Sequence, residues 1–344
     1  MIEIQVQSER SYNVSIDTNW SLELEKIAAE HAKILVIAPE SMKARLNLDG
    51  YEVFYTPDGE AQKTLGTVGE IWNRLGEIQL GRKDAIVGIG GGATTDVAGF
   101  VAATWLRGVT WYAIPTTLAA MVDASVGGKT GINTGAGKNL VGAFYSPAAV
   151  LIDLSFLETL SDRDYSAGLA EVIKTGIISD VSILDLLEST KDISAARSHS
   201  AELISKSIQV KAKVVSADFT EGKLREILNF GHTLGHAIEK LSAYELRHGE
   251  AVSIGTIYAL YLSEELSGLD PAITARVIAL LVKFSLPTSY RDLGWSSILE
   301  LMQGDKKSRD SKLRFIGISE LGNPVWLESV PTEIAAKSYE RILS

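Results

Sequence analysis

Three of the five histidines in this 344-residue chain lie near one another in the sequence. His232 and His236 are four residues apart, so on a helix they would share one face, and His248 follows soon after. Imidazole nitrogens bind divalent metals well, but Thr233 stands where a metalloprotease motif has glutamate. The alternative is a group of histidines that only form hydrogen bonds within the protein. Three together favour a metal site.

The composition restricts the other ligands of such a site. The chain has no cysteine, so a metal must be bound by histidine and carboxylate groups, and neither a disulfide framework nor a cysteine nucleophile exists. Glu171, within Gly168–Lys174, is the carboxylate with the most motif-like surroundings. We therefore expect Glu171 to complete the histidine site.

A second group of residues has the features of a phosphate site. A strand runs into consecutive glycines and then into a helix, for which Thr94 or Thr95 is the expected N-cap. Backbone N–H groups at such a turn favour an anion, and Gly88-x-Gly90-x-x-Ala93 fits the dinucleotide-binding pattern. No acidic residue follows about twenty positions later. A tight turn without a ligand is the alternative, and the context favours a pyrophosphate.

Basic residues accompany both groups. Lys129 and Lys138 lie in a glycine-rich loop that resembles the end of a Walker A motif, but Asp123 replaces its first glycine, which excludes a nucleotide triphosphatase. Arg225 lies four residues before Asn229 and would share its helical face. Lys174, Lys211 and Arg107 also lie beside the motif segments. These cations either face solvent or converge on an anionic ligand.

The hydrophobic pattern predicts how these groups are positioned. Near-continuous apolar runs at 33–37, 51–55, 85–89, 109–114 and 149–153 indicate buried parallel strands between helices. Amphipathic stretches at 162–178, 201–217, 224–241, 250–267 and 271–284 indicate helices, followed by a hairpin at 313–318 and 324–327 and a closing helix. We expect a doubly wound α/β domain at 1–160 and a mostly helical domain at 161–344.

Charge and hydropathy exclude several classes of protein. The 33 Lys and Arg against 43 Asp and Glu give a net charge of −10, which repels nucleic acid and anionic membranes. The sequence contains no basic and apolar leader pattern at Met1 and no apolar run long enough for a bilayer. We expect a cytoplasmic enzyme that acts on a small molecule.

Taken together, these segments resemble the 3-dehydroquinate synthases, a family of sugar phosphate cyclases. The similarity extends from Pro57–Lys63 to Asp305–Lys307 and includes Gly90–Phe100, Asp123–Phe144, Ala170–Lys174 and Leu228–His236 in the expected order. The resemblance implies a Rossmann-like NAD domain, a helical domain that binds zinc or cobalt, and a homodimer. It implies conversion of 3-deoxy-D-arabino-heptulosonate 7-phosphate to 3-dehydroquinate through transient oxidation by NAD, phosphate β-elimination, reduction, ring opening and aldol closure.

The resemblance also implies roles for individual residues. It assigns the metal to Glu171, His232 and His248, and so replaces the helical pair His232 and His236 suggested by spacing. His236 would then not bind the metal but would either contact one of the metal ligands or bind the substrate phosphate. The other residues expected at the substrate are Lys129, Asn139, Lys174, Lys211, Arg225, Asn229 and one of Lys306 and Lys307, together with Arg107, which would reach into the partner subunit's site.

The implied NAD contacts lie in the first half of the chain. They are Glu60, Lys63, Gly91, Gly92, Asp96, Thr116, Thr117, Asp123, Lys129, Lys138 and Thr159. One departure concerns the adenosine ribose, because Pro39 stands after the strand where the family usually has aspartate. Either Glu40 substitutes for that carboxylate or the affinity for NAD is lower.

Three alternatives to dehydroquinate synthesis remain at this stage. Another sugar phosphate cyclase would act on a substrate without a carboxylate, which the cationic set around Arg225 disfavours. A metal-dependent polyol dehydrogenase would accumulate reduced nicotinamide in proportion to product. A non-catalytic NAD-binding module would release no phosphate and would be indifferent to Glu171→Gln.

Overall fold

The computed structural model describes the chain except for residues 243–244, 291–293, 306–312 and 344, so Lys306 and Lys307 lie outside the described residues. The chain forms two compact units. The first contains Met1–Leu160 and Lys211–Thr220, and the second contains Ser161–Val210 and Glu221–Ser344. Helix α8 (Ser200–Ala217) contributes residues to both.

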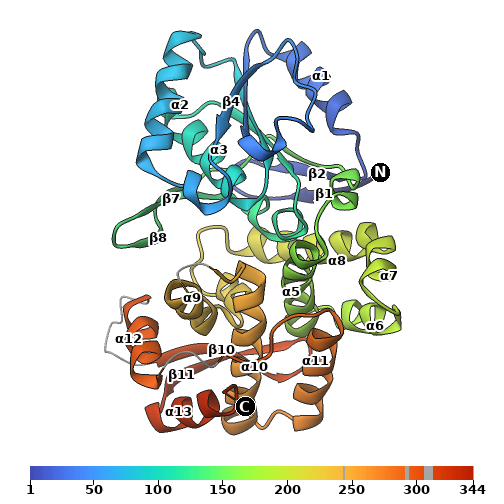
Figure 1. Cartoon of the computed structure of the whole chain (residues 1–344), viewed down its shortest axis with the longest axis vertical. Coiled ribbons are helices and arrows are strands. Elements are labelled where there is room, and N and C mark those ends of the chain that lie inside the picture. The colour runs from blue at the N-terminus through green and yellow to red at the C-terminus, as the bar shows by residue number, and fades with distance from the viewer. Residues whose placement is uncertain (243–244, 291–293, 306–312, 344) are drawn as a thin grey trace. The chain divides into compact units, whose positions relative to one another are not determined.

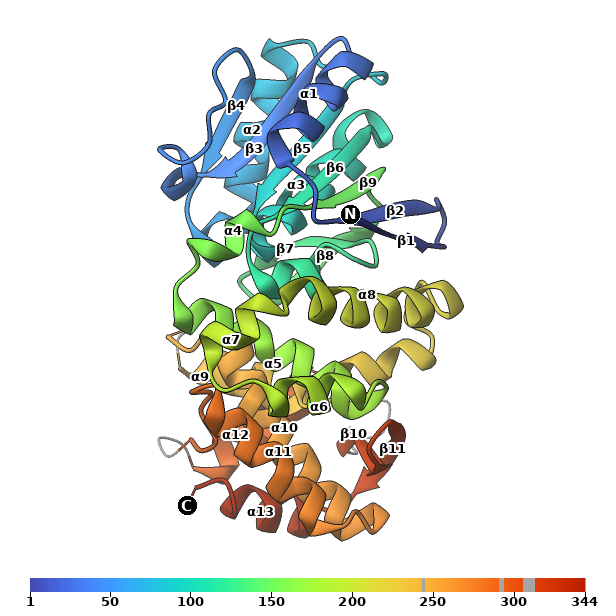
Figure 2. The same ribbon diagram turned by 90° about the vertical axis from the view of Figure 1, so that its right-hand side faces the viewer.

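The first unit is built on a seven-stranded sheet with the order β1-β2-β9-β6-β5-β3-β4, in which only β1 is antiparallel to its neighbour (Figures 1 and 2). The predicted α/β class is therefore confirmed. In chain order its elements are β1 (Ile2–Val6), β2 (Tyr12–Ile16), α1 (Trp20–Glu30), β3 (Ile34–Pro39), η1 (Glu40–Met42), β4 (Glu52–Thr56), η2 (Gly59–Gln62), α2 (Leu65–Glu77), β5 (Ala85–Gly90), α3 (Gly92–Thr104), η3 (Trp105–Arg107), β6 (Thr110–Pro115), the π-helical turn η4 (Ala120–Ala124), β7 (Lys129–Thr134), β8 (Gly137–Phe144), β9 (Ala149–Ile152) and α4 (Ser155–Glu158).

The order of the parallel strands determines where a ligand can bind. Every residue of β3 and β5 is buried, as expected for strands covered on both faces. One core cluster joins Leu24 and Ile27 of α1 to Val36 and Val87 of these strands. Counted from β3, the strand order is 2-1-3-4-5, whose topological switch point lies between β3 and β5. A ligand crevice is expected at their carboxyl ends.

Three local features of the first unit differ from the sequence-based predictions. The glycine-rich segment of Lys129 and Lys138 is not a loop but the antiparallel hairpin β7–β8. Helix α3 begins after Gly91 with no side-chain cap, so the prediction of a threonine cap was wrong. Both threonines lie inside the helix, because it starts as soon as the chain leaves the strand. The hairpin β1–β2 was not predicted.

The second unit is mostly helical, with a small antiparallel hairpin (Figure 1). Helix α10 is its central element and packs against α5, α9, α11, α13 and β10. Besides the first part of α8, the elements are α5 (Asp162–Ile178), α6 (Ser182–Ser189), α7 (Ile193–Ser198), the 3₁₀ helix η5 (Leu224–Asn229), α9 (His232–Leu241), α10 (His248–Ser267), α11 (Pro271–Lys283), α12 (Trp295–Asp305), β10 (Leu313–Glu320), β11 (Asn323–Val330) and α13 (Thr332–Glu340).

The single helix expected at 224–241 is in fact two helices. Gly231 separates η5 from α9. Its backbone is left-handed, with φ 77°, a conformation that residues other than glycine rarely adopt. A Cβ at Gly231 would also lie 2.8 Å from the backbone nitrogen of Thr256. The close approach of α10 therefore imposes the break. Among the described residues, no helix combines the length and apolarity that a membrane span requires.

The contact of α9 with α10 gives a stability prediction. A Cβ at Gly255 would lie 1.9 Å from the carbonyl oxygen of Gly231, so Gly255→Ala must force the two helices apart. We expect it to reduce the free energy of unfolding by about 3 kcal/mol. Gly69→Ala in α2 is the control, because no heavy atom lies within 4 Å of its Cβ position. It should leave stability unchanged or raise it by about 1 kcal/mol. Urea unfolding followed by circular dichroism measures both, and equal stabilities would contradict the prediction.

Candidate active site

A buried acidic and basic pair lies in the middle of α5. Glu171 and Lys174 are each only 2% exposed, and Lys174 Nζ lies 2.5 Å from Glu171 Oε2. Burying either charge alone would be strongly unfavourable, so each stabilises the other. The ion pair satisfies one oxygen of the carboxylate and leaves Oε1 to be compensated.

Two histidines face that second oxygen. Nε2 of His232 and Nε2 of His248 lie 3.6 and 3.3 Å from Glu171 Oε1. Even so, Oε1 accepts no hydrogen bond from any residue that the structure describes. Buried carboxylate oxygens are rarely left in this state, so a ligand is expected there. One oxygen and two imidazole nitrogens are a suitable donor set for a divalent metal, and all three lie within 4.8 Å of one another.

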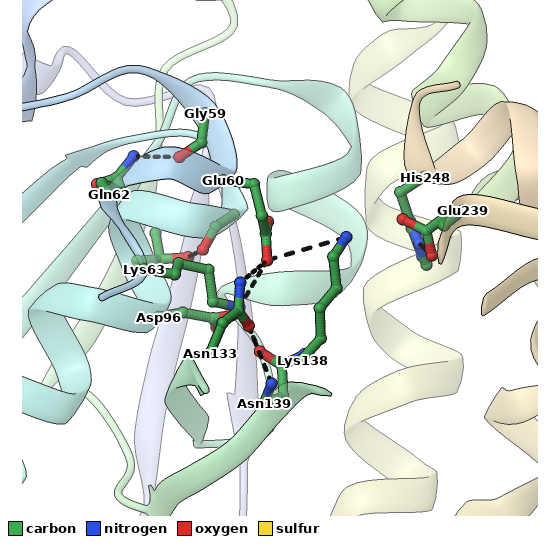
Figure 3. Close-up of polar contacts among 12 residues, drawn as sticks. Gly59, Glu60, Gln62, Lys63, Asp96, Asn133, Lys138, Asn139, Glu239 and His248 are labelled. Atoms are coloured by element: carbon green, nitrogen blue, oxygen red, sulfur yellow. Dashed lines mark hydrogen bonds and ion pairs between the residues drawn. The ribbon is translucent and has the colours of Figure 1, made fainter. Parts of the chain in front are cut away.

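The opposite edges of both rings have partners. His232 Nδ1 lies 3.1 Å from the carbonyl oxygen of Phe230, which only accepts, so the ring N–H at Nδ1 donates this hydrogen bond. His248 Nδ1 lies 3.3 Å from Glu239 Oε2, and Figure 3 shows the Glu239 carboxylate beside the His248 ring. Such contacts place the proton on Nδ1 and leave Nε2 as the ligand atom. The three residues therefore fit a metal.

The charges of the site follow from burial and from these contacts. Burial opposes ionisation of Glu171, but Lys174 and His232 hold its pKa well below the ordinary value. Burial, and then the Lys174 ammonium group, keep the pKa of His232 well below its ordinary value. Burial also opposes protonation of His248, but Glu239 and Glu171 outweigh it and raise its pKa to about 10. Without a metal, His248 therefore carries a second ring proton and a positive charge at neutral pH.

His236 and Glu239 form a second group around the same histidine. Together with His248 they are another set of potential ligands, and the ring centroids of His236 and His232 are 5.3 Å apart. Glu239 is 4% exposed. Sequence reasoning gave it no role, although the three-residue spacing from His236 would place both on one helix face.

The remaining described residues of this unit that were expected at the substrate lie on η5. Arg225 is 2% exposed, and Asn229 Nδ2 donates to Glu221 Oε1 at 3.0 Å. In a 3₁₀ helix, residues four apart do not share a face. The expectation of one common face for Arg225 and Asn229 was therefore wrong. The described residues of the second unit bring together Glu171, Lys174 and three histidines.

In the first unit, a buried lysine links three segments (Figure 3). Lys63 is 3% exposed, and its Nζ lies 2.6 Å from Asp96 Oδ2 in α3 and also donates to Asn139 Oδ1 in β8. Burial raises the pKa of Asp96 although Lys63 opposes this. The two expected cofactor residues therefore lie together, and Asn139, expected at the substrate, is bound to them.

Glu60 holds the tip of the same hairpin. Its Oε1 accepts a hydrogen bond from Asn133 Nδ2 at 2.7 Å and lies 3.9 Å from Lys138 Nζ (Figure 3). The backbone N–H of Asn139 donates to Asn133 Oδ1, and Asn139 has a left-handed φ of 55°. Asn133 was not among the predicted site residues, although it lies within the segment Asp123–Phe144 that carries part of the family resemblance.

The glycine turn lies at the switch point of the sheet. Gly91 follows β5 and Gly92 starts α3, which has no side-chain cap and no acidic residue in its first turn. Its first N–H groups are thus oriented toward the crevice as an anion site requires. Thr116 N–H donates to Gly90 O at 2.9 Å, and a Cβ at Gly91 would lie 3.4 Å from the Thr117 methyl group. This part of the chain fits the pyrophosphate of a dinucleotide.

The other predicted residues of the first unit have separate positions. Lys211 Nζ donates to the carbonyl and the carboxylate oxygen of Asp123. Lys129 is exposed at the start of β7. Thr159 contacts Arg45 and the Phe156 carbonyl. The structure does not bring Thr159 into contact with the cluster formed by Lys63, Asp96 and Asn139.

Two further positions singled out from the sequence of the first unit are Arg107 and the end of β3. Arg107 is exposed in the turn η3, with a left-handed φ of 66°. Strand β3 ends at Pro39, and the carboxylate of Glu40 beyond it is 59% exposed and 3.5 Å from Lys43. Arg107 and Glu40 lie at the surface of the unit, whereas Pro39 is buried.

Comparison with known proteins decides the family. The family models described as 3-dehydroquinate synthase N-terminal and C-terminal match residues 53–167 and 168–308. The chain belongs to the 3-dehydroquinate synthase family. A 3-dehydroquinate synthase of Streptomyces avermitilis is 49% identical over 93% of this chain and 89% of its own length. That of Thermobifida fusca is 46% identical over 96% and 93%.

A solved structure agrees with this family membership. The structure of 2-deoxy-scyllo-inosose synthase, described as complexed with carbaglucose-6-phosphate, NAD⁺ and Co²⁺, has a TM-score of 0.90 and 25% sequence identity. The match covers 99% of this chain and 100% of the inosose synthase chain. The 3-dehydroquinate synthases are carbon–oxygen lyases that act on phosphates, and this chain is an enzyme of that family.

The proton on His248 gives a prediction for metal binding. Because a metal needs the neutral ring, binding should release about one proton per metal between pH 7 and 9, and affinity should rise about tenfold per pH unit. Calorimetry of the metal-free protein with zinc, in buffers of different ionisation enthalpy, measures the released protons. Glu239→Gln removes a carboxylate that raises the pKa of His248, so the rise of zinc affinity with pH should level off at a lower pH in this variant. Binding without proton release would contradict the assignment.

Proposed function

We propose that the chain converts 3-deoxy-D-arabino-heptulosonate 7-phosphate into 3-dehydroquinate and phosphate, and that it uses Glu171, His232 and His248 to hold one divalent metal, zinc or cobalt. The observation that carries this proposal is the buried Oε1 of Glu171, which faces two Nε2 atoms and accepts no hydrogen bond from a described residue. Family membership makes the reaction the first choice among those that such a site supports.

Two cofactors would supply chemistry that side chains lack: bound NAD would accept a hydride from the C5 alcohol and give it back, and a metal held by Glu171, His232 and His248 would polarise that alcohol. The remaining work belongs to residues of this chain. Lys174 keeps Glu171 ionised and places an ammonium group within 2.5 Å of the ligand carboxylate. It is therefore positioned to bind a hydroxyl or carboxylate oxygen of the substrate beside the metal.

Anion recognition is the second task. The substrate carries a carboxylate and a phosphate, and cationic or amide groups bind both. In the second unit these groups are Lys174, Arg225, Asn229 and His236. In the first unit they are Lys129, Asn139 and Lys211. Asn139 accepts a hydrogen bond from Lys63, and Lys211 donates one to Asp123. A ketone at C5 would acidify the neighbouring C–H, and loss of that proton would allow phosphate to leave by β-elimination. Return of the hydride to C5 would then restore the oxidation level, so that no net oxidation results.

NAD would occupy the crevice of the first unit. The Gly91–Gly92 turn would bind the pyrophosphate, and Thr116 and Thr117 border the turn. The further residues that we assign to NAD are Glu60, Lys63, Asp96, Asp123, Lys138 and Thr159. The division into an NAD domain at 1–160 and a metal and substrate domain at 161–344 is part of the same proposal.

A substrate comparison tests this proposal. The purified chain with NAD⁺ and zinc or cobalt should release phosphate from the heptulosonate, and turnover with sedoheptulose 7-phosphate or glucose 6-phosphate should be at least about a hundredfold lower, because neither has the carboxylate. Reduced nicotinamide should not accumulate in proportion to product. Turnover restricted to either sugar phosphate would assign a different cyclase, and stoichiometric NADH would assign a dehydrogenase.

We further propose a cytoplasmic homodimer in which Arg107 reaches the partner subunit's active site. The support within this chain is the exposed position of Arg107 and its strained backbone, since left-handed residues other than glycine concentrate at functional positions. Its neighbour Leu106 also has a left-handed φ, of 49°, and is 40% exposed.

Subunit complementation tests the role of Arg107. Arg107→Ala and Glu171→Gln should each reduce turnover at least about a hundredfold. After subunit exchange, an equal mixture should regain about a quarter of the parent activity, because each mixed dimer contains one site with both residues intact. If Arg107 acts within its own subunit, no mixed dimer has an intact site and the mixture stays inactive.

A further inference from the structure

Two helices that carry proposed metal ligands touch where α10 begins. Glu171 lies on α5 and His248 is the first residue of α10, and their side chains approach to 3.3 Å. One turn earlier on α5, the backbone of Ala167 lies against Gly249, where a Cβ would be 1.8 Å from the Ala167 carbonyl oxygen. The distance between the two ligands therefore depends on how the first turn of α10 sits on α5.

Ion pairs fasten this same turn. Arg163 lies one further turn back on α5, on the face of Ala167 and Glu171, and binds Glu250 with two parallel hydrogen bonds of 2.5 and 2.8 Å. The adjacent Arg247 Nε donates to Asp164. Glu250 Oε2 also accepts the Arg247 N–H at 2.9 Å, so it fixes the start of α10 in two ways.

The pairs are arranged in a row with the ligands. Along α5 the residues at 163, 167 and 171 are spaced by four, and they meet 250, 249 and 248 of α10 in turn. The Glu250 side chain is only 9% exposed, whereas Arg163 is 57% exposed. Loss of the guanidinium would leave a largely buried carboxylate without its main partner, and the start of α10 would have to move to hydrate it.

We propose that Arg163 and Glu250 are positioning residues of the metal site. They hold the first turn of α10 against α5 and so set the separation of His248 from Glu171. Neither residue is a ligand, and neither was identified from the sequence. The proposal rests on the metal site described above, and it adds that metal affinity depends on an ion pair two turns of α5 away from the ligand.

Zinc affinity of the full chain tests the proposal. Metal-stripped Arg163→Gln should bind zinc about 10- to 100-fold more weakly than the parent in competition with a chromogenic chelator, the range found when outer partners of metal ligands are removed. The matched control is Arg276→Gln. Arg276 binds Glu188 through two hydrogen bonds of 2.7 and 2.8 Å in the same unit, between α11 and α6, and contacts none of the metal residues that the structure describes. Its zinc affinity should match the parent.

Further variants keep the outcome clear. Arg163→Lys retains the charge but not the two parallel bonds, and it should give a smaller loss; it carries the test if the glutamine variant does not fold. Parent-like affinity in the Arg163 variants, or an equal loss in Arg276→Gln, would overturn the proposal. Glu171→Gln separates the two proposals, because parent-like zinc binding there would mean that the metal site itself is wrongly assigned.

Discussion

The carboxylate of Glu171 imposes the main constraint on the second unit. An ionised oxygen in the interior is strongly unfavourable unless it is compensated from every side. Lys174 compensates one oxygen from the same helix. The second oxygen is compensated only from other helices, so α9 and the start of α10 must bring His232 and His248 to it. A divalent cation at the proposed site would complete the carboxylate and both imidazoles at once, which would account for their close approach.

Close helix packing is the means by which the fold meets this constraint. The chain must turn sharply before His232, and Gly231 permits the turn and lets α10 pass beside it. Polar contacts then fix each ring: the Phe230 carbonyl holds His232, and Glu239 holds His248. Under the proposed metal assignment, affinity for a cation would depend also on residues that contact the ligands without being ligands themselves.

The sequence predicted regular elements well and their junctions poorly. All five predicted parallel strands are present, and the helix at 162–178 has the predicted limits, because a long hydrophobic pattern depends on the local chain. The spacing of His232 and His236 suggested a ligand pair, yet the rings that face Glu171 are those of His232 and His248. That geometry arises from tertiary packing, which spacing along one helix cannot contain. The family resemblance did imply that His232 and His248 face Glu171, because the motifs of a family reflect the packing that its members share.

Other differences have the same origin. The break at Gly231 depends on Thr256 in a different helix, and the hairpin at 129–144 was obscured by its glycines. Partners such as Glu239 and Asn133 were not predicted as site residues, although Asn133 lies within the segment Asp123–Phe144, because their contacts become evident only from the fold.

Helix α8 belongs partly to each unit, and this has a consequence for the order of folding. Lys211–Thr220 completes the first unit, where Lys211 binds Asp123 and Phe219 packs on Phe144 at a ring separation of 5.5 Å. Synthesis reaches this segment only after the opening helices of the second unit. The growing chain thus cannot finish its first unit when residue 160 leaves the ribosome. Until Lys211–Thr220 has been synthesised, the strands and helices of the first unit leave exposed the surface that this segment covers in the folded protein.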